Sequence, residues 1–318
     1  MYIVTGGAGF IGANIVAGLN QQGITEILVV DNLTRGDKFL NIRDLSITDF
    51  MDKTEFRAHL HKGTFKHLVP QAIFHQGACS DTMEYDGRYM MDNNFTYSKE
   101  LLHFALDRST PFLYASSAAV YGASTQFVED PNHEKPLNVY GYSKLLFDRY
   151  VEQLRPRLRS TVVGLRYFNV YGPREQHKGR MASMVYQLHQ QLQNSGVAHL
   201  FEGSGGYGHG EQRRDFICVA DVVRVNLFLA RQQNLRGVCN VGSGQSRSFN
   251  DIAHHLIRRL GRGELRYKPM PEELAKKYQN FTEANVTRLR RAGFSQPFTT
   301  LEAGIDTFLE AEGGGATS

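Results

Sequence analysis

The amino-acid sequence predicts an α/β fold, a doubly wound parallel sheet with helices on both faces, followed by a smaller C-terminal domain. Apolar runs of four to six residues alternate with longer segments of helical periodicity, which is typical of parallel strands joined by helices. A glycine-rich turn follows the first run, and the regular alternation ends after about Tyr171. The expected strands are 2–5, 26–31, 72–75, 111–116 and 162–166, and the expected helices between them are 12–22, 86–108 and 140–154.

The glycine-rich turn has the spacing of a dinucleotide-binding motif. Gly6, Gly9 and Gly12 lie directly after the first strand and open the first helix. At this spacing the first glycine permits a tight turn, the second lets the backbone approach a pyrophosphate, and the third lets helix and strand pack closely. Free N–H groups at the helix start would face the phosphates. Asp31 ends the second strand nineteen residues after Gly12, so the sequence predicts a Rossmann-type domain that binds a nicotinamide dinucleotide.

The choice between NAD and NADP depends on the charges near Asp31. Its carboxylate would accept hydrogen bonds from the ribose of NAD and would repel the 2′-phosphate of NADP. However, Asn32, Arg35 and Lys38 follow immediately, and Lys53 comes after the next segment. Cations there could bind the phosphate and offset Asp31. The residues alone therefore leave both cofactors open, with the balance toward NADP.

The second half of the chain predicts the smaller domain. Helices are expected at 181–194, 220–232 and 248–261, and strands at 215–219 and 237–241. A length of 318 residues suggests two domains. We expect residues 1–170 to form the dinucleotide-binding domain, with part of 215–243 returning to it. Residues 171–318 are expected to form most of a substrate-binding domain.

Composition and charge argue against several functional classes. The net charge of +4 comes from scattered basic residues, so no nucleic acid partner is expected. The three cysteines, Cys79, Cys218 and Cys239, are far apart in the chain, which predicts neither a disulfide framework nor a metal site. No apolar run approaches the length of a membrane span. Because a strand begins directly at Tyr2, we expect a cytoplasmic protein.

A tyrosine and a lysine at helical spacing suggest the catalytic chemistry. Tyr140 and Lys144 are four residues apart and share one face of an expected helix. An ammonium beside a phenol favours the phenolate, so Lys144 is expected to lower the pKa of Tyr140. The pair could then accept a hydroxyl proton while hydride leaves to the nicotinamide. Ser116 and Ser117 end an expected strand at the sheet edge where ligands bind, and either hydroxyl could orient the substrate oxygen.

Together these motifs resemble the extended short-chain dehydrogenase/reductase family. The resemblance covers essentially the whole chain and rests on the glycine turn, the serine pair, the Tyr140/Lys144 pair and a Tyr-Gly-Pro-Arg segment at 171–174. Longer segments resemble a branch of this family that epimerises an ADP-linked heptose. These segments are 75–80, 89–94, 166–175 and the His-Lys-Gly element at 177–179.

The resemblance implies one tightly bound NADP in each subunit. Lys144 would hold the nicotinamide ribose, while Asp31, Asn32, Lys38 and Lys53 would surround the adenosine ribose and its phosphate. The whole set expected at the cofactor is Gly6, Gly9, Phe10, Ile11, Gly12, Asp31, Asn32, Lys38, Lys53, His75, Gln76, Gly77, Ala78, Cys79, Asn93, Lys144, Val170 and Lys178.

The resemblance also implies an ADP-heptose substrate and a homo-oligomer, in the form of a pentamer. Because 205–212 is richer in glycine than the family pattern, the choice between Arg213 and Arg214 as the substrate arginine stays open. The residues expected at the substrate are Asn169, Arg180, Gln187, Phe201, Glu202, Gly203, Ser204, Arg214 and Tyr278.

The implied reaction inverts carbon 6 of the heptose, for the core region of lipopolysaccharide. This carbon has no neighbouring carbonyl, so its hydrogen is not acidic and simple deprotonation cannot invert it. Transient oxidation to an aldehyde removes the stereocentre, and hydride can return to the other face. Opposite faces need proton-transfer groups on opposite sides, a role that the resemblance assigns to Tyr140 and Lys178.

Two other kinds of function compete with this interpretation. One is a 4-epimerase or a dehydratase of the same fold. A dehydratase would need an acidic pair beside the serine, and Ser117 is followed by two alanines. The other is a cofactor-sensing protein without turnover. Such a protein would be expected to lose Tyr140 or Lys144, and both are present.

Overall fold

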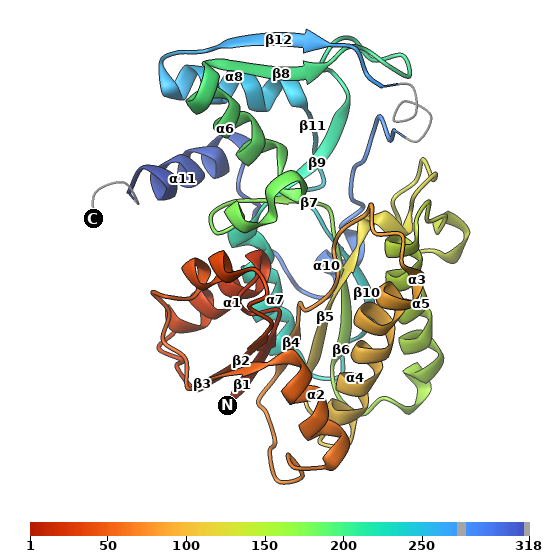
Figure 1. The fold of residues 1–318 in the computed structure, drawn as a ribbon. Helices are drawn as coiled ribbons and strands as arrows, with labels where there is room; N and C mark the ends of the chain where they lie inside the picture. The colour runs from red at the N-terminus through yellow and green to blue at the C-terminus, as the bar shows by residue number, and fades with distance from the viewer. Residues whose placement is uncertain (272–277, 315–318) are drawn as a thin grey trace.

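The computed structural model describes residues 1–271 and 278–314 and is built around one large parallel sheet (Figure 1). Seven strands lie in the order β10-β6-β5-β4-β1-β2-β3, and every neighbouring pair is parallel. This order confirms the predicted doubly wound sheet. The strands are β1 (Tyr2–Thr5), β2 (Ile27–Asp31), β3 (Asp49–Asp52), β4 (Ile73–His75), β5 (Phe112–Ser117), β6 (Val162–Tyr167) and β10 (Arg236–Val241).

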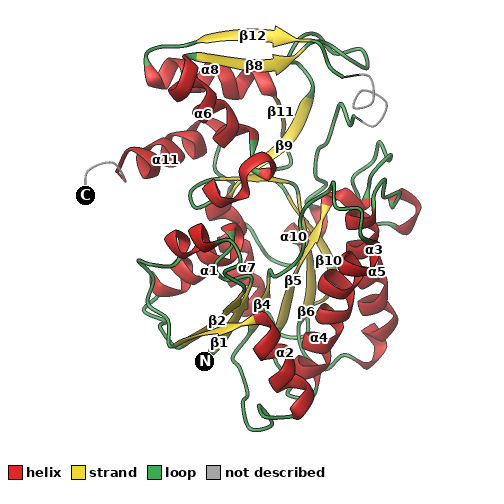
Figure 2. Cartoon of the chain, viewed as in Figure 1, coloured by secondary structure: helices red, strands yellow, loops and turns green. Residues whose placement is uncertain are grey.

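Helices cover both faces of this sheet (Figure 2). On one face, α1 (Phe10–Asn20), α7 (Val219–Ala230) and α10 (Thr287–Arg291) bury their apolar side chains. On the other, α2 (Lys53–Lys62), α4 (Tyr97–Leu106) and α5 (Val139–Leu154) do the same. The central strands are buried on both sides, so they consist of continuous apolar runs rather than alternating ones.

One expected helix is more complex than its pattern indicates. The segment 86–108 contains α3 (Gly87–Met91), a π-helical turn (Asp92–Thr96) and then α4. The side chain of Asp86 caps the start by accepting hydrogen bonds from Arg88 N and Tyr89 N. The π turn lies next to α5, which carries Tyr140 and Lys144. Such turns in helices often occur at functional sites.

A smaller lobe lies beyond the carboxyl ends of the large sheet's strands (Figure 1). It holds a three-stranded sheet in the order β11-β9-β7 and a two-stranded parallel sheet of β8 and β12. Its strands are β7 (Asn169–Tyr171), β8 (Val197–Phe201), β9 (Arg213–Cys218), β11 (Ser246–Ser248) and β12 (Glu264–Lys268). Its helices are α6 (Met184–Ser195), α8 (Phe249–Leu260) and α11 (Leu301–Gly314), which share one apolar core.

The chain crosses between the two parts more than once. β7 and β9 belong to the smaller lobe, whereas α7 and β10 return to the large sheet. We therefore propose two domains that divide at about residue 171, with part of 215–243 belonging to the first. No helix within residues 1–271 and 278–314 is long and apolar enough to cross a lipid bilayer.

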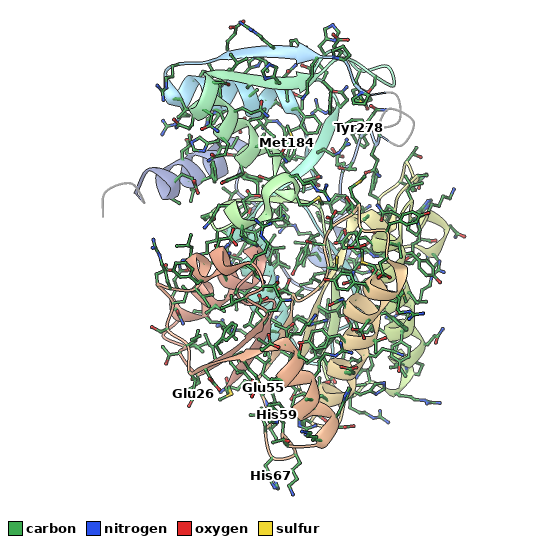
Figure 3. The ribbon with its side chains drawn as sticks, in the orientation of Figure 1. Glu26, Glu55, His59, His67, Met184 and Tyr278 are labelled. Carbon is green, nitrogen blue, oxygen red and sulfur yellow. The ribbon has the colours of Figure 1, made fainter. Side chains whose placement is uncertain are left out.

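Only one end of the large sheet faces the smaller lobe. Glu26, Glu55 and His67 lie at the end away from the smaller lobe and are exposed (Figure 3). Met184 and Tyr278 lie at the opposite end, where the smaller lobe meets the sheet. Ligands of open parallel sheets bind at the carboxyl ends of the strands, so the site is expected on the side of Met184 and Tyr278.

Candidate active site

A cavity of about 910 Å³ separates the sheet from the smaller lobe. The glycine turn and the ends of β2, β4, β5 and β6 line one side, and α6, β8 and Tyr278 line the other. It has the volume of a site for a cofactor or a drug-sized ligand. All five expected catalytic residues line it, as do all the expected cofactor residues except His75.

The glycine turn fits a pyrophosphate. Gly6 has a φ of 65°, and a Cβ at this position would meet Gly77 N at 2.6 Å. A Cβ at Gly12 would lie 2.1 Å from the carbonyl oxygen of Gly6. Gly9 is the N-cap residue of α1, and no side chain of the described residues caps the N–H groups of this helix. The residues present therefore fit a nicotinamide dinucleotide whose diphosphate binds these free donors.

Two lysines define the end of the cavity that would hold the adenosine ribose. Lys38 forms an ion pair with Asp31 and donates a hydrogen bond to Asn32 O at 2.9 Å. The other carboxylate oxygen of Asp31 accepts from Ala8 N at 2.9 Å. Lys53 donates to Asn93 Oδ1 at 2.6 Å, and burial lowers the pKa of this lysine. The negative charge of Asp31 is therefore compensated inside the protein.

Tyr140 lies in the first turn of α5, and its phenol lines the cavity. Asn138 caps this helix by accepting a hydrogen bond from Gly141 N at 2.8 Å. Burial raises the pKa of Tyr140, and a hydrogen bond to the Ser117 hydroxyl opposes this rise. The expectation that Lys144 lowers the pKa of Tyr140 is wrong for the protein alone, because desolvation dominates at this position.

Lys144 lies one turn further along α5 and is only 5% exposed. Its Nζ donates to the carbonyl oxygen of Ala115 at 2.8 Å. Burial lowers the pKa of Lys144 to about 8, and the negative charge of Asp148 opposes this fall. The ammonium is thus held against the end of β5, beside the serines, where it can donate further hydrogen bonds to a ribose.

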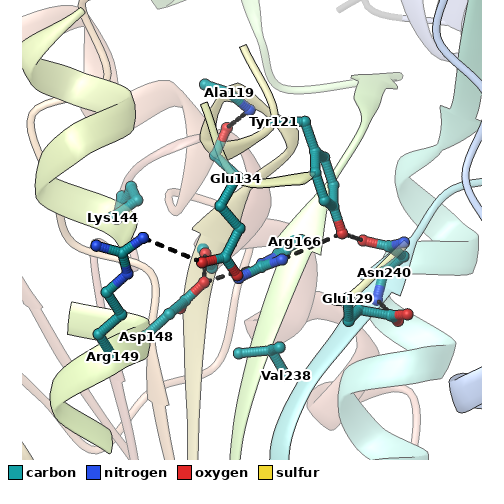
Figure 4. A network of polar contacts seen from close by, with 12 residues as sticks. Ala119, Tyr121, Glu129, Glu134, Lys144, Asp148, Arg149, Arg166, Val238 and Asn240 are labelled. Carbon is teal, nitrogen blue, oxygen red and sulfur yellow. Dashed lines mark hydrogen bonds and ion pairs between the residues drawn. The ribbon is translucent and has the colours of Figure 1, made fainter. Parts of the chain in front are cut away.

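A buried ionic network lies beneath these residues (Figure 4). Arg166 is 1% exposed and donates from Nε to Asp148 Oδ2 at 2.9 Å and from Nη2 to Glu134 Oε1 at 2.5 Å. The Ser116 hydroxyl donates to the same Asp148 carboxylate at 2.9 Å. Ser116 is therefore occupied by the network. The Ser117 hydroxyl has no bond to this network among the described residues; it accepts a hydrogen bond from Ala119 N at 3.1 Å and acts to lower the pKa of Tyr140.

Lys178 enters the cavity from the loop that follows β7. Its Nζ lies 5.2 Å from the centre of the Phe10 ring, at the start of α1. Burial lowers the pKa of Lys178, and Glu175 opposes this effect. A lysine with a lowered pKa gives up its proton more readily than a solvent-exposed lysine does.

Asn41 connects this loop with the glycine turn. Its side-chain amide, which is fully buried, donates to Ala8 O at 2.9 Å and to His177 Nδ1 at 2.9 Å. Burial lowers the pKa of His177 to about 4, with Lys38 and Lys178 adding to the effect, so the ring is neutral and can accept this hydrogen bond. Arg174 adds a second link by donating to Asn41 O at 2.6 Å. The loop that carries Lys178 is thus fixed to the dinucleotide-binding part.

The far end of the cavity combines an arginine with aromatic rings. The Arg214 guanidinium lies 5.0 Å from the centre of the Tyr278 ring and 5.7 Å from that of Phe249. Arg213 instead donates to Ser246 O at 2.5 Å. Of the two candidate arginines, Arg214 therefore faces the cavity. Asn169, Gln187, Phe201 and Tyr278 also line it, as expected.

Five expected residues do not line this cavity in the described part of the chain. His75 is buried behind the glycine turn between Thr5 Oγ1 at 2.6 Å and Ser98 Oγ at 2.8 Å. Arg180 is 72% exposed and forms an ion pair with Asp81 at 2.8 Å. Glu202, Gly203 and Ser204 follow β8 and are not among the residues that line the cavity. Direct ligand contacts by these residues are therefore not supported.

Other lining residues were missed by the sequence analysis. The Lys268 ammonium lies 5.4 Å from the centre of the Phe201 ring, because β12 pairs with β8. Only that strand pairing brings Lys268 to the site, so no local motif identifies it. His177 is next to Lys178 in sequence, and this proximity was the available signal. The missed polar residues include Tyr89, His177, Gln191, His199, Gln212 and Lys268.

The fold and the site define an enzyme of the extended short-chain dehydrogenase/reductase type, and known proteins agree. The chain belongs to the NAD dependent epimerase/dehydratase family, which it matches over residues 2–242. It is 54% identical over 312 residues to the ADP-L-glycero-D-manno-heptose-6-epimerase of Alkalilimnicola ehrlichii, covering 98% of this chain and 97% of that protein. The predicted family resemblance is therefore confirmed.

Two solved structures are also similar. The ADP-L-glycero-D-manno-heptose-6-epimerase of Helicobacter pylori superposes with a TM-score of 0.83 at 31% identity, over 97% of this chain and 95% of that one. The UDP-glucose 4-epimerase of Thermotoga maritima gives 0.81 at 27% identity, over 99% of both chains. These relatives share the whole architecture, including the smaller lobe.

Proposed function

We propose that this protein inverts carbon 6 of ADP-D-glycero-D-manno-heptose to give ADP-L-glycero-D-manno-heptose, the precursor of lipopolysaccharide core heptose. One observation carries the proposal. Tyr140 lies in the first turn of α5 and Lys178 lies against the start of α1, and these helices pack on opposite faces of the sheet. Two proton-transfer groups therefore enter one cavity from different sides. The high identity to the Alkalilimnicola enzyme supports the choice of sugar.

The residues divide the chemistry between them. A bound nicotinamide supplies a reversible hydride acceptor for carbon 6. Once the positive charges of a bound nicotinamide ring and of Lys144 favour its phenolate form, Tyr140 would take the proton of the 6-hydroxyl as that carbon is oxidised, and Ser117 would orient the oxygen. After the aldehyde rotates, Lys178 would donate a proton to its oxygen while the carbon is reduced from the other face. The sugar regains one hydride and one proton, so no net oxidation occurs, and the two side chains exchange their protons with solvent.

A related 4-epimerase is the second candidate, because the Thermotoga structure superposes over the full length. The test is incubation with ADP-D-glycero-D-manno-heptose, followed by NMR of the product at carbon 6. We expect a new signal set for the L-glycero epimer, with no net change in cofactor absorbance. An unchanged heptose, together with conversion of a UDP-hexose, would overturn the heptose assignment.

The NADP form of the cofactor is also part of the proposal. The ion pair of Lys38 with Asp31 supports it, because it neutralises the carboxylate that would repel a 2′-phosphate. Arg35 lines the same end of the cavity, and its guanidinium, which lies 3.5 Å from the Asp37 carboxylate, adds a second positive charge there. One tightly bound NADP per subunit, a homo-oligomeric assembly and a cytoplasmic location complete the proposal, on the family resemblance.

Removal of the Lys38 ammonium is expected to shift cofactor preference toward NAD. In Lys38→Met the Asp31 carboxylate keeps its charge and loses its counter-ion, so the Kd for NADP relative to NAD should rise by about tenfold or more. The ratio can be measured by titrating cofactor-free protein with each dinucleotide. Lys66→Met, which removes an exposed lysine outside the cavity, serves as the matched control. An unchanged ratio in Lys38→Met would contradict the NADP proposal.

A further inference from the structure

One buried carboxylate closes the loop that carries Lys178. Glu175 is 1% exposed and accepts three hydrogen bonds. They come from Gly172 N at 3.2 Å, Ser183 N at 2.6 Å and the Ser183 hydroxyl at 2.7 Å. Gly172 follows β7 and Ser183 caps α6. The two ends of the segment 172–183 are therefore joined through a single side chain.

Lys178 lies in the middle of the segment that this carboxylate closes. Its backbone N–H donates to Glu175 O at 2.9 Å, which begins a short 3₁₀ turn. The 3₁₀ segment Gln176–Met181 is kinked at Gly179, whose φ of 54° favours glycine. The outer side of the segment is fixed separately, by the bidentate pair of Arg174 with Asp44 at 2.8 and 2.6 Å. The contacts that close this segment therefore fix where the Lys178 side chain starts and the direction in which it points.

The same carboxylate also sets the charge around Lys178. Burial lowers the pKa of Lys178, and Glu175 is the charged group that opposes this. Burial raises the pKa of Glu175 itself, while its hydrogen bonds and Lys178 act against the rise. Two further groups face Glu175 from the packed helices, Tyr186 on α6 and Glu312 on α11. The three hydrogen bonds and Lys178 favour the charged form of Glu175.

We propose that Glu175 is a positioning residue for Lys178. By closing the 172–183 segment, Glu175 holds the Lys178 ammonium at the proton-transfer position in the cavity. This inference rests on the role proposed above for Lys178 in epimerisation. Glu175 itself does not line the cavity, and it acts on the reaction only through the lysine. A residue of this kind should affect the chemical step and leave ground-state binding unchanged.

The test compares Glu175→Gln with Glu175→Asp in protein that retains its cofactor. Glu175→Gln keeps the shape and removes the charge, so kcat should fall about tenfold or more while KM for ADP-heptose stays the same. Loss of the negative charge lowers the pKa of Lys178, so the alkaline limb of the kcat profile should move to lower pH. Glu175→Asp keeps the charge and shortens the reach, so kcat should fall with the alkaline limb in place.

Glu310→Gln is the matched control, because it removes an exposed carboxylate of the same helix α11 that has no hydrogen bond or ion pair with Glu175 in the described part of the chain. It should leave kcat and its pH profile unchanged. A Glu175→Gln protein with wild-type kcat, or with an increase in KM alone, would overturn the inference.

Should Glu175→Gln fail to retain cofactor, Glu175→Asp decides the question. A drop in its kcat of at least about fivefold at constant KM supports the positioning role, and an unchanged kcat overturns it. Wild-type protein that leaves carbon 6 unaltered would instead defeat the proposed function, and this result is visible before any variant is made.

Discussion

A double variant, Tyr140→Phe with Lys178→Met, is expected to lose epimerisation by at least about 10⁴-fold while its nicotinamide cofactor stays bound. Positioned acid–base groups contribute about 10²–10⁴ each, and the variant removes one from each side of the cavity. Phenylalanine and methionine keep most of the volume, so the cofactor cradle at Gly6 and Gly12 is unaffected. The measurement combines product NMR with the absorbance of the cofactor released by denaturation.

Tyr142→Phe is the control for this variant. Tyr142 lies on the same helix, two residues from Tyr140, but its side chain is about half exposed and does not line the cavity. Its replacement should leave the rate within about twofold of wild type, since exposed substitutions away from such sites have small effects. Substantial epimerisation by the Tyr140→Phe, Lys178→Met protein would defeat the two-base scheme.

Replacement of Arg166 by methionine is expected to destabilise the fold by about 3–5 kcal/mol. The change leaves Asp148 buried without its counter-ion and Glu134 with only the more distant Arg149, and burial already raises the pKa of Asp148. The Ser116 and Tyr114 hydroxyls, which donate to Asp148 at 2.9 and 3.0 Å, compensate only part of the charge. Urea unfolding followed by circular dichroism measures the difference.

Arg149→Met provides the comparison, because Arg149 reaches the same Glu134 from solvent. Its guanidinium is half exposed and 3.6 Å from the carboxylate. A pair of this kind contributes about 0–1 kcal/mol. If the Arg166 and Arg149 variants lost equal free energy of unfolding, the prediction that loss of the buried counter-ion is the more destabilising change would be wrong.

The parts of the site that could be predicted are those with a local signature. The glycine turn and the Tyr140/Lys144 pair each lie within a few residues, so spacing alone places their members together. β3 and α2 were missed because β3 is a half-exposed edge strand with an aspartate at each end. The other strands of the large sheet were predicted from continuous apolar runs, which are typical of buried parallel strands. The segment Asp49–Asp52 has no such run.

Other features depend on contacts between distant segments and on solvation. Burial, rather than Lys144, dominates the pKa of Tyr140, and sequence spacing carries no information on desolvation. His75 is close in sequence to the lining residues Gln76 to Cys79, yet its ring is hydrogen-bonded to Thr5 on the neighbouring strand β1 and to Ser98 on α4. Successive residues of a strand face opposite sides, so adjacency in sequence does not establish contact with a ligand.

The buried amide of Asn41 touches both the dinucleotide turn, through Ala8, and the lysine loop, through His177. Energetic coupling between two binding events is reciprocal. If a dinucleotide bound at the glycine turn strengthens binding of the sugar beside the lysine loop, then the bound sugar strengthens binding of the dinucleotide by the same free energy. An epimerase leaves its nicotinamide cofactor in the same oxidation state at the end of each cycle. It therefore does not need to release the cofactor between turnovers, and coupling that keeps the cofactor bound is an advantage.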